Sequence, residues 1–123
     1  MKILNGTDII EIERIEENIK NHGEKFLNKI YTKKEIEYCE AKGINKYESY
    51  AVRFAGKEAV FKALDLDSRE NISWKEIEII NKENGKPEVK LSQKMDGLDY
   101  IEISLSHSKQ YAIAFAIAVF KEK

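Results

Sequence analysis

The chain contains very little cysteine and proline. Of its 123 residues, one is cysteine, Cys39, and one is proline, Pro87. A single cysteine cannot form an internal disulfide, and no C-x-x-C or H-E-x-x-H pattern indicates a zinc site. Proline-rich and glycine-rich linkers are also absent. We therefore expect one continuous domain, residues 1–123, without a disulfide framework.

Long apolar runs are absent as well. The longest run, residues 111–120, is about half as long as the roughly 20 residues that a membrane-spanning helix requires. The first residues, Met1 to Gly6, show no apolar stretch of signal-peptide length. We expect no membrane segment and a cytoplasmic location.

Neither sign of charge is in excess. The chain has 21 Lys and Arg against 22 Asp and Glu, a net charge of −1. A protein that binds nucleic acid through a basic face needs a clear positive excess, so this class is excluded. Hydrophobic residues make up 42% of the chain, enough for a packed core, which excludes a disordered chain.

Helical periodicity dominates the first half. Isoleucine recurs every three or four residues over 11–21, which predicts an amphipathic helix ending near Gly23. Thr32 with Glu35 has the pattern of a capping box and predicts the start of a second helix. A longer, mostly apolar helix of about five turns is expected to begin at Asn45.

Alternation of apolar and polar residues marks the second half. Residues 77–79 alternate, Asn84-Gly85 is a turn signal, and alternation resumes beyond Pro87, which predicts a hairpin. Residues 101–106 alternate, and 111–119 carry large residues at odd positions and alanine at even ones. The flat alanine face would let a helix or another subunit approach closely. The expected class is α+β, with helices packed on a mainly antiparallel sheet.

Three charged residues are candidates for a site that binds a metal ion and a phosphate. Asp8 follows a short first strand, which we expect to break at Asn5-Gly6 and to bend into a helix. Glu58 and Lys62 are four residues apart on the long helix. If the two carboxylates converge, they supply the hard oxygen ligands that Mg²⁺ takes. Two plainer interpretations are a helix N-cap for Asp8 and an intrahelical ion pair for Glu58 with Lys62.

Polar residues gather where the fourth predicted strand ends. The segment Ser104-Leu105-Ser106-His107-Ser108-Lys109 offers donors for an anion, although serine and lysine are also ordinary turn residues. Adjacent strand residues point to opposite faces, and no G-x-S-x-G elbow is present, so Ser106 and His107 are not a serine-hydrolase pair.

Four segments taken together resemble one enzyme family. They are Gly6-Thr7-Asp8, residues 53–63, Asn84-Gly85-Lys86-Pro87 and residues 104–108. Their order and spacing, over essentially the whole chain, are similar to the holo-[acyl-carrier-protein] synthases, the short 4′-phosphopantetheinyl transferases. The resemblance implies that family's fold and Mg²⁺-dependent transfer of 4′-phosphopantetheine from coenzyme A to a serine of apo acyl carrier protein, for fatty acid biosynthesis. Adenosine 3′,5′-bisphosphate would be released.

The resemblance also implies roles for single residues. Asp8 and Glu58 match the carboxylates that hold Mg²⁺ with the pyrophosphate of coenzyme A, and Lys62 matches the lysine at the reacting phosphates. The general base stays open between Glu58 and a metal-bound water. The residues expected to bind coenzyme A are Arg53, Lys62, Gly85, Lys86, Pro87, Ser106, His107 and Ser108.

Partners follow from the same resemblance. Arg14 matches the arginine that faces the acidic recognition helix of the carrier protein, and Phe54 is assigned to that contact too. Lys20, Lys25 and Lys29 would extend Arg14 into a basic patch. Family members of this length form trimers with sites between subunits, so we expect a homotrimer that binds neither nucleic acid nor membrane.

Two other functions fit the residues less well. A metal-dependent nuclease or phosphodiesterase typically carries its second carboxylate and its lysine on a strand, and the chain lacks basic charge. A nucleotide-binding or interaction module would keep the fold without the chemistry, but intact Asp8, Glu58 and Lys62 argue against it. One departure from the family is Gly56, where alanine is usual, because glycine inside a helix costs about 1 kcal/mol.

Overall fold

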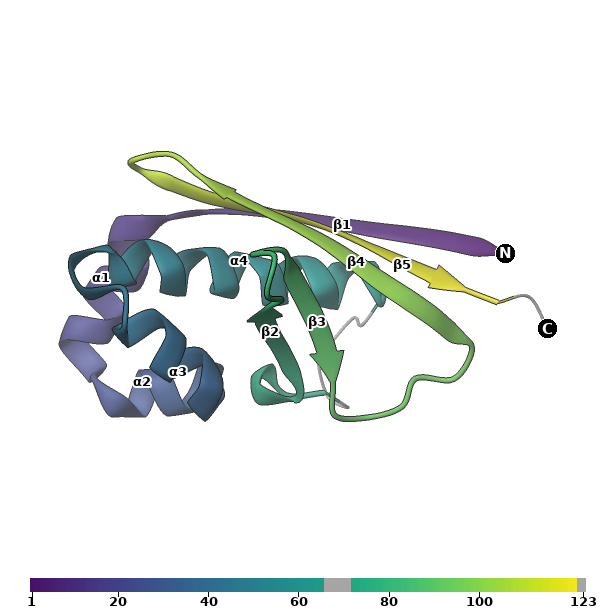
Figure 1. Cartoon of the computed structure of the whole chain (residues 1–123), viewed down its shortest axis with the longest axis horizontal. Helices are drawn as coiled ribbons and strands as arrows, with labels where there is room; N and C mark the ends of the chain where they lie inside the picture. Colours follow the sequence, from purple (N-terminus) through teal and green to yellow (C-terminus); the bar gives the residue numbers. More distant parts are fainter. Residues whose placement is uncertain (66–71, 122–123) are drawn as a thin grey trace.

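The computed structural model describes residues 1–65 and 72–121 and confirms the α+β class. The helices and a small hairpin form a layer beneath a three-stranded sheet (Figure 1). The elements in chain order are β1 (Lys2–Glu11), α1 (Ile12–His22), α2 (Glu24–Ile30), α3 (Lys33–Glu40), the 3-10 turn η1 (Gly43–Asn45), α4 (Lys46–Ala63), the 3-10 turn η2 (Trp74–Glu76), β2 (Ile77–Asn81), β3 (Pro87–Leu91), β4 (Leu98–His107) and β5 (Tyr111–Phe120).

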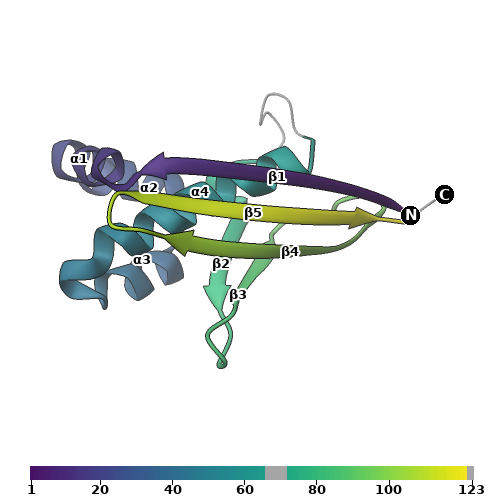
Figure 2. The same ribbon diagram turned by 90° about the horizontal axis from the view of Figure 1, so that it is seen from above.

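The main sheet is antiparallel, and β5 lies in its centre between β1 and β4. β2 and β3 pair separately as the predicted hairpin, and its turn contains Gly85 with φ +87°. Viewed from above, β1 and β4 form the two edges of the sheet, and the hairpin tip projects beyond the β4 edge (Figure 2). The strands predicted over 77–79, 101–106 and 111–119 are confirmed.

The first strand is longer than the sequence indicated. β1 continues through Asn5 and Gly6 and pairs with β5 along its whole length, so the expected break there is wrong. Gly6 is explained by packing, because a Cβ at this position would collide with the carbonyl oxygen of Ala59 and lie 2.7 Å from Cβ of Lys62. Because Gly6 has no side chain, the backbone of α4 can cross directly against the backbone of β1.

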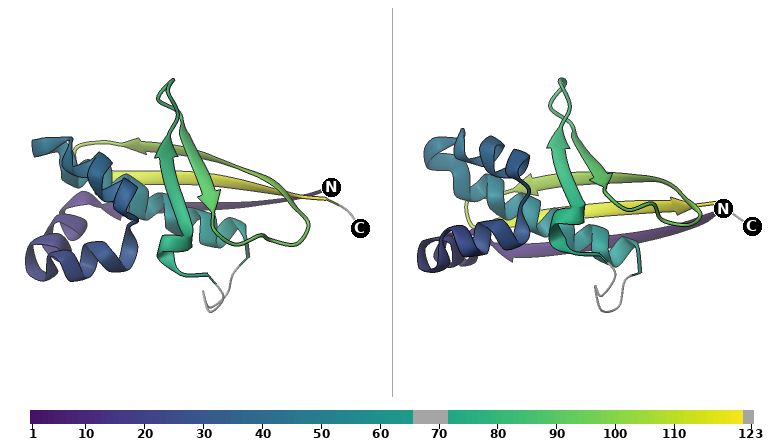
Figure 3. Two further views of the ribbon diagram at one scale, coloured as in Figure 1. Left: turned by 60° about the horizontal axis from the view of Figure 1, so that its bottom comes forward. Right: turned by 90° about the horizontal axis from the view of Figure 1, so that it is seen from below.

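The central strand presents its alanines to α4, as the alternation predicted. The alanines at even positions of 112–118 are buried, whereas Tyr111, Ile113 and Phe115 are each 44% exposed on the opposite face. Small side chains allow the helix to lie close against the sheet. Figure 3 shows α4 between the sheet and the β2–β3 hairpin, where it forms the centre of the molecule.

Gly56 marks a second close crossing on α4. A Cβ here would lie 2.6 Å from Cδ1 of Ile79 and 3.1 Å from Cδ2 of Leu105. The propensity cost expected for this glycine is therefore offset by the close packing of β2 and β4 against the helix.

The three short helices pack around the first half of α4. The helix predicted over 11–21 is α1, and it ends at Gly23, whose N–H donates to the carbonyl oxygen of Ile19 at 2.7 Å. The capping box of α3 is confirmed, because Glu35 N–H donates to Thr32 Oγ1 and Thr32 N–H donates to Glu35 Oε1. Within the described ranges, no helix has both the length and the apolar content to cross a bilayer.

Candidate functional site

β1 and α4 bring Asp8 and Lys62 together. Lys62 Nζ donates to the carbonyl oxygen of Thr7 at 2.8 Å and lies 3.4 Å from Asp8 Oδ1. Asp8 lies inside β1, and the N-cap of α1 is Glu11, so the helix-cap interpretation of Asp8 is wrong. The Asp8 carboxylate therefore lies beside a cation that comes from another element.

Glu58 lies one helical turn before Lys62. β1 and α4 run in opposite directions (Figure 1), and Gly6 touches α4 at Lys62 and its neighbours. The two residues from Gly6 to Asp8 advance about 6.6 Å along β1, and the turn from Lys62 back to Glu58 covers about 6 Å of α4. This register places Glu58 at the level of Asp8, on the side of α4 that faces β1.

We call Asp8, Glu58 and Lys62 the carboxylate–lysine group. Its two carboxylates supply oxygen ligands that fit a magnesium ion. The Asp8 side chain is 19% exposed and that of Lys62 is 52% exposed, so the group is open to a ligand. Mg²⁺ usually takes one or two carboxylates and completes its shell with water and phosphate oxygens. In the part of the chain that the structure describes, no cluster of three or more His, Cys, Asp or Glu forms an all-protein metal cage. The residues that would hold the ion are Asp8 and Glu58.

A buried ion pair fixes the helix that carries Glu58. Lys57 Nζ donates to Glu35 Oε1 at 2.6 Å and to the carbonyl oxygens of Ile30 and Trp74, and neither charged side chain is exposed. The other oxygen of Glu35 accepts from Ile79 N–H at 2.8 Å. Burial lowers the pKa of Lys57, while the Glu35 carboxylate opposes this shift. The pair ties α4 to the end of α2, to α3 and to β2.

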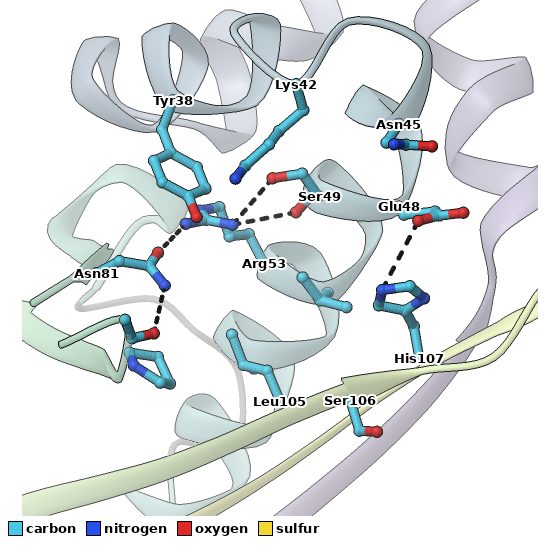
Figure 4. A pocket seen from close by; sticks show the side chains of 13 residues that line it. Tyr38, Lys42, Asn45, Glu48, Ser49, Arg53, Asn81, Leu105, Ser106 and His107 are labelled. Carbon is cyan, nitrogen blue, oxygen red and sulfur yellow. Dashed lines mark hydrogen bonds and ion pairs between the residues drawn. The ribbon is translucent and has the colours of Figure 1, made fainter.

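A pocket of about 330 Å³ lies between α3, the first turns of α4, the β2–β3 hairpin and the end of β4 (Figure 4). We call it the hairpin pocket. Five of the residues predicted to bind coenzyme A line it, namely Arg53, Gly85, Pro87, Ser106 and His107. Lys86 lies exposed in the neighbouring turn, and Ser108 Oγ accepts from Tyr111 N–H in the β4–β5 turn.

Arg53 forms a buried part of the pocket wall. Its side chain is 3% exposed, and its Nη1 donates to Ser49 Oγ at 3.1 Å while Nη2 donates to Asn81 Oδ1 at 2.5 Å. The guanidinium lies 4.2 Å from the centre of the Tyr38 ring. These contacts hold a permanent positive charge at a fixed place beside the cavity.

Two further side-chain contacts line the pocket. His107 Nε2 lies 3.7 Å from a carboxylate oxygen of Glu48, and Lys42 Nζ lies 4.6 Å from the centre of the Tyr38 ring (Figure 4). Sequence reasoning missed Tyr38, Lys42, Glu48 and Asn81 as pocket residues. Helical spacing could have identified Glu48, because residues 48, 49, 52 and 53 share one face of α4.

The carboxylate–lysine group and the hairpin pocket do not meet within one chain. Asp8 is on β1 and His107 is on β4, the two opposite edges of the sheet (Figure 2). None of Asp8, Glu58 and Lys62 lines the hairpin pocket. Arg53 and Glu58 are five residues apart, which separates them by about 140° around the helix. The two groups therefore occupy different sides of α4.

The residues predicted to contact the carrier protein differ in exposure. Arg14 and Lys20 are exposed on α1, and Lys20 is paired with Glu16 at 2.6 Å. Lys25 and Lys29 are exposed on α2. Phe54 is half-buried and stacks on Trp74 with ring centres 4.9 Å apart. Because Trp74 covers part of this ring, a contact of Phe54 with the carrier stays a prediction.

Solved structures with similar folds include two holo-[acyl-carrier-protein] synthases. One is the enzyme from Helicobacter pylori in complex with coenzyme A, with a TM-score of 0.86 and 34% identity over 94% of this chain and 100% of that chain. The other, from Bacillus anthracis in complex with CoA (3′,5′-ADP), has a TM-score of 0.79 and 34% identity over 94% of both chains.

Sequence comparison points to the same family. The holo-[acyl-carrier-protein] synthase of Ruminiclostridium cellulolyticum is 48% identical over 95% of this chain and 92% of its own length. That of Chlamydia felis is 48% identical over 93% of this chain and 94% of its own length. The model of the 4′-phosphopantetheinyl transferase superfamily matches residues 5–116. The chain therefore belongs to the 4′-phosphopantetheinyl transferase superfamily.

Proposed function

We propose that this chain transfers the 4′-phosphopantetheine group of coenzyme A to a serine hydroxyl of apo acyl carrier protein. The observation that carries the proposal is the contact of Asp8 with Lys62 at the crossing of β1 and α4, one helical turn from Glu58. Relatives that share 48% of their residues with this chain over nearly its whole length are named for this reaction.

In this reaction the serine oxygen attacks the β-phosphorus of coenzyme A. A bond forms between the serine oxygen and phosphorus, the bond from phosphorus to the bridging oxygen breaks, and adenosine 3′,5′-bisphosphate leaves with the electron pair. Magnesium bound by Asp8 and Glu58 would offset the negative charge of the pyrophosphate. Lys62, held by the carbonyl oxygen of Thr7, places an ammonium group beside the same charge. Glu58 or a water molecule would take the serine proton.

The hairpin pocket supplies the counterpart for the nucleotide end of coenzyme A. Arg53 and His107 line it with positive or ionisable nitrogen groups, and Lys42 lies at its rim. Gly85 and Pro87 line the pocket and would face the adenosine. A ligand with anionic phosphates and a planar base matches a pocket that combines these nitrogen groups with the Tyr38 ring.

We further propose a homotrimer in which each site is shared between neighbours. The carboxylate–lysine group and the hairpin pocket lie on different sides of α4 in one chain, so a neighbouring chain has to complete the site. The outer sheet face supplies an apolar surface for such contact, with Ile9 61% exposed and Ile113 and Phe115 each 44% exposed. A cytoplasmic location, a role in fatty acid biosynthesis and carrier docking on α1 belong to the same proposal.

The test is intact-mass spectrometry of an apo acyl carrier protein incubated with this chain, coenzyme A and Mg²⁺. We expect the carrier to gain one phosphopantetheine group, and we expect Asp8→Ala or EDTA to abolish the gain. A folded wild-type chain that binds coenzyme A but modifies none of several carriers would overturn the proposal and favour a binding module.

A further inference from the structure

We propose that Asn81 is a positioning residue that fixes the β2–β3 turn against α4 and thereby sets the affinity of the hairpin pocket for the nucleotide end of coenzyme A. The inference rests on the proposed function and adds a residue to it. Asn81 is the last residue of β2, at the point where the hairpin leaves its paired strands.

Asn81 links α4 to the β2–β3 turn, and the first half of this link joins Asn81 to α4. Its Oδ1 accepts from Arg53 Nη2, while Nη1 of the same guanidinium donates to the carbonyl oxygen and to Oγ of Ser49 (Figure 4). Arg53 and Ser49 both belong to α4 and are both buried. The Nη1 atom therefore holds the guanidinium against α4, and Nη2 is left in a fixed position to donate to Asn81.

The second half joins Asn81 to the turn. Its Nδ2 donates to the carbonyl oxygen of Gly85 at 2.9 Å. The turn has its own backbone bonds, from Gly85 N–H to Lys82 and from Lys82 N–H to Lys86, each 2.8 Å. These bonds shape the turn but do not hold it to α4. The single amide of Asn81, which bonds both Arg53 and Gly85, connects the turn to the helix.

The position of this turn matters because Gly85 and Pro87 line the hairpin pocket. The tip of the hairpin projects beyond the β4 edge (Figure 2), so its place relative to α4 depends on contacts near its base. A wall that is already in place spares the ligand the entropy cost of ordering it. Asn81 itself also lines the pocket, but the role proposed for it is to act on the nucleotide by holding Gly85 in place.

The experiment uses Asn81→Ala and Asn81→Leu, which both remove the two hydrogen bonds, while leucine keeps the branched shape of the side chain. In both variants we expect the Kd for adenosine 3′,5′-bisphosphate, measured by calorimetry, to rise about ten-fold. The KM for coenzyme A should rise in parallel, while kcat and the KM for the carrier stay within about two-fold. Hydrogen exchange at the Gly85 and Lys86 amides should become faster.

The matched control is Lys82→Ala, one residue further along the same hairpin. Lys82 is exposed, pairs with Glu88 at 3.7 Å and does not line the pocket, so nucleotide affinity should not change. The inference is overturned if folded Asn81 variants bind as the wild type does, if Lys82→Ala weakens binding equally, or if kcat and carrier KM change as much as nucleotide affinity. A wild-type chain that neither binds adenosine 3′,5′-bisphosphate nor modifies a carrier overturns the proposed function instead.

Discussion

At the scale of single residues, Gly6 and Gly56 are required by contact between elements. We expect Gly6→Ala to lower the free energy of unfolding by about 3 kcal/mol, because its Cβ would meet the backbone of α4, which cannot turn aside. Gly56→Ala should cost less, about 1 to 2 kcal/mol, because its nearest neighbour is the end of the Ile79 side chain. Urea denaturation of the two variants measures the difference.

Gly23→Ala is the control for this ordering. A Cβ at Gly23 would meet no atom within 4 Å, and its φ of +53° leaves only backbone strain, about 1 kcal/mol. If Gly6→Ala proved as stable as Gly23→Ala, close contact between β1 and α4 would be the wrong explanation for Gly6.

The sequence was informative about residues whose partners lie on the same helix or in the same motif. Glu58 and Lys62 share a helix side by spacing alone, and the Thr32 capping box needs only four consecutive residues. The role of Asn81 could not be predicted this way, because it depends on a hydrogen bond with Arg53, which is 28 residues earlier in the chain. Such a contact exists only once the hairpin has packed on α4.

At the scale of elements, strand alternation and helical periodicity predicted α1, α3, α4 and the strands but missed α2 and the two 3-10 turns, and the error in β1 has a clear origin. Asn5-Gly6 is a turn signal when judged locally. The structure instead uses Gly6 inside a straight strand, because α4 passes over it. A local pattern cannot distinguish a glycine that turns the chain from one that admits a neighbouring helix.

The helices α1 to α4 also enclose groups that make the fold sensitive to alkali. Burial raises the pKa of the Tyr31 hydroxyl and of the Cys39 thiol, and it raises that of Tyr50 with help from its hydrogen bond to Glu40. Groups with a raised pKa keep their protons in the folded chain and lose them in the unfolded one, so stability falls as pH rises. Lys57, whose pKa is lowered, acts in the opposite direction.

Three buried groups have a raised pKa and only Lys57 has a lowered one. We therefore expect a net loss of stability at pH values above 9.0 and 10.0, the ordinary pKa values of a thiol and a tyrosine. The urea midpoint should be lower at about pH 10.5 than at about pH 8. Tyr31→Phe should make this decrease smaller, whereas Tyr100→Phe, at a tyrosine that is 50% exposed, should not. Equal decreases in both variants and the wild type would show that buried Tyr31 does not contribute.

The outer surface of α1 is the element where carrier recognition can be tested. Arg14→Glu reverses an exposed charge and should raise the KM for acyl carrier protein about ten-fold while leaving that for coenzyme A nearly unchanged, because the proposed carrier docking pairs Arg14 with an acidic helix. Lys90→Glu, an equal charge change on exposed β3, is the control and should alter neither value at physiological salt. Equal effects of Arg14→Glu on both substrates would refute the basic patch.

At the scale of the whole molecule, the composition and the order of elements were enough to predict the α+β class. They could not predict on which side of α4 each functional residue lies relative to the sheet. Asp8 and His107 are on opposite edges because β5, the last strand, inserts between β1 and β4. That separation is a property of the sheet order, and it makes an assembly of several chains part of the proposed chemistry.

The assembly predicts the behaviour of Phe115→Asp. Phe115 points away from α4, so an aspartate there leaves the alanine core intact but places a charge on the apolar outer face. Light scattering should give three times the 14.3 kDa chain mass for the wild type and one chain mass for the variant. The separated chain keeps its own hairpin pocket, so it should still bind adenosine 3′,5′-bisphosphate while transfer falls at least about 100-fold for lack of a neighbour's carboxylates. The control is Ile44→Asp, at an isoleucine on η1 that is 95% exposed, and this variant should keep the mass of the wild type. A wild type with the mass of one chain would refute the shared site.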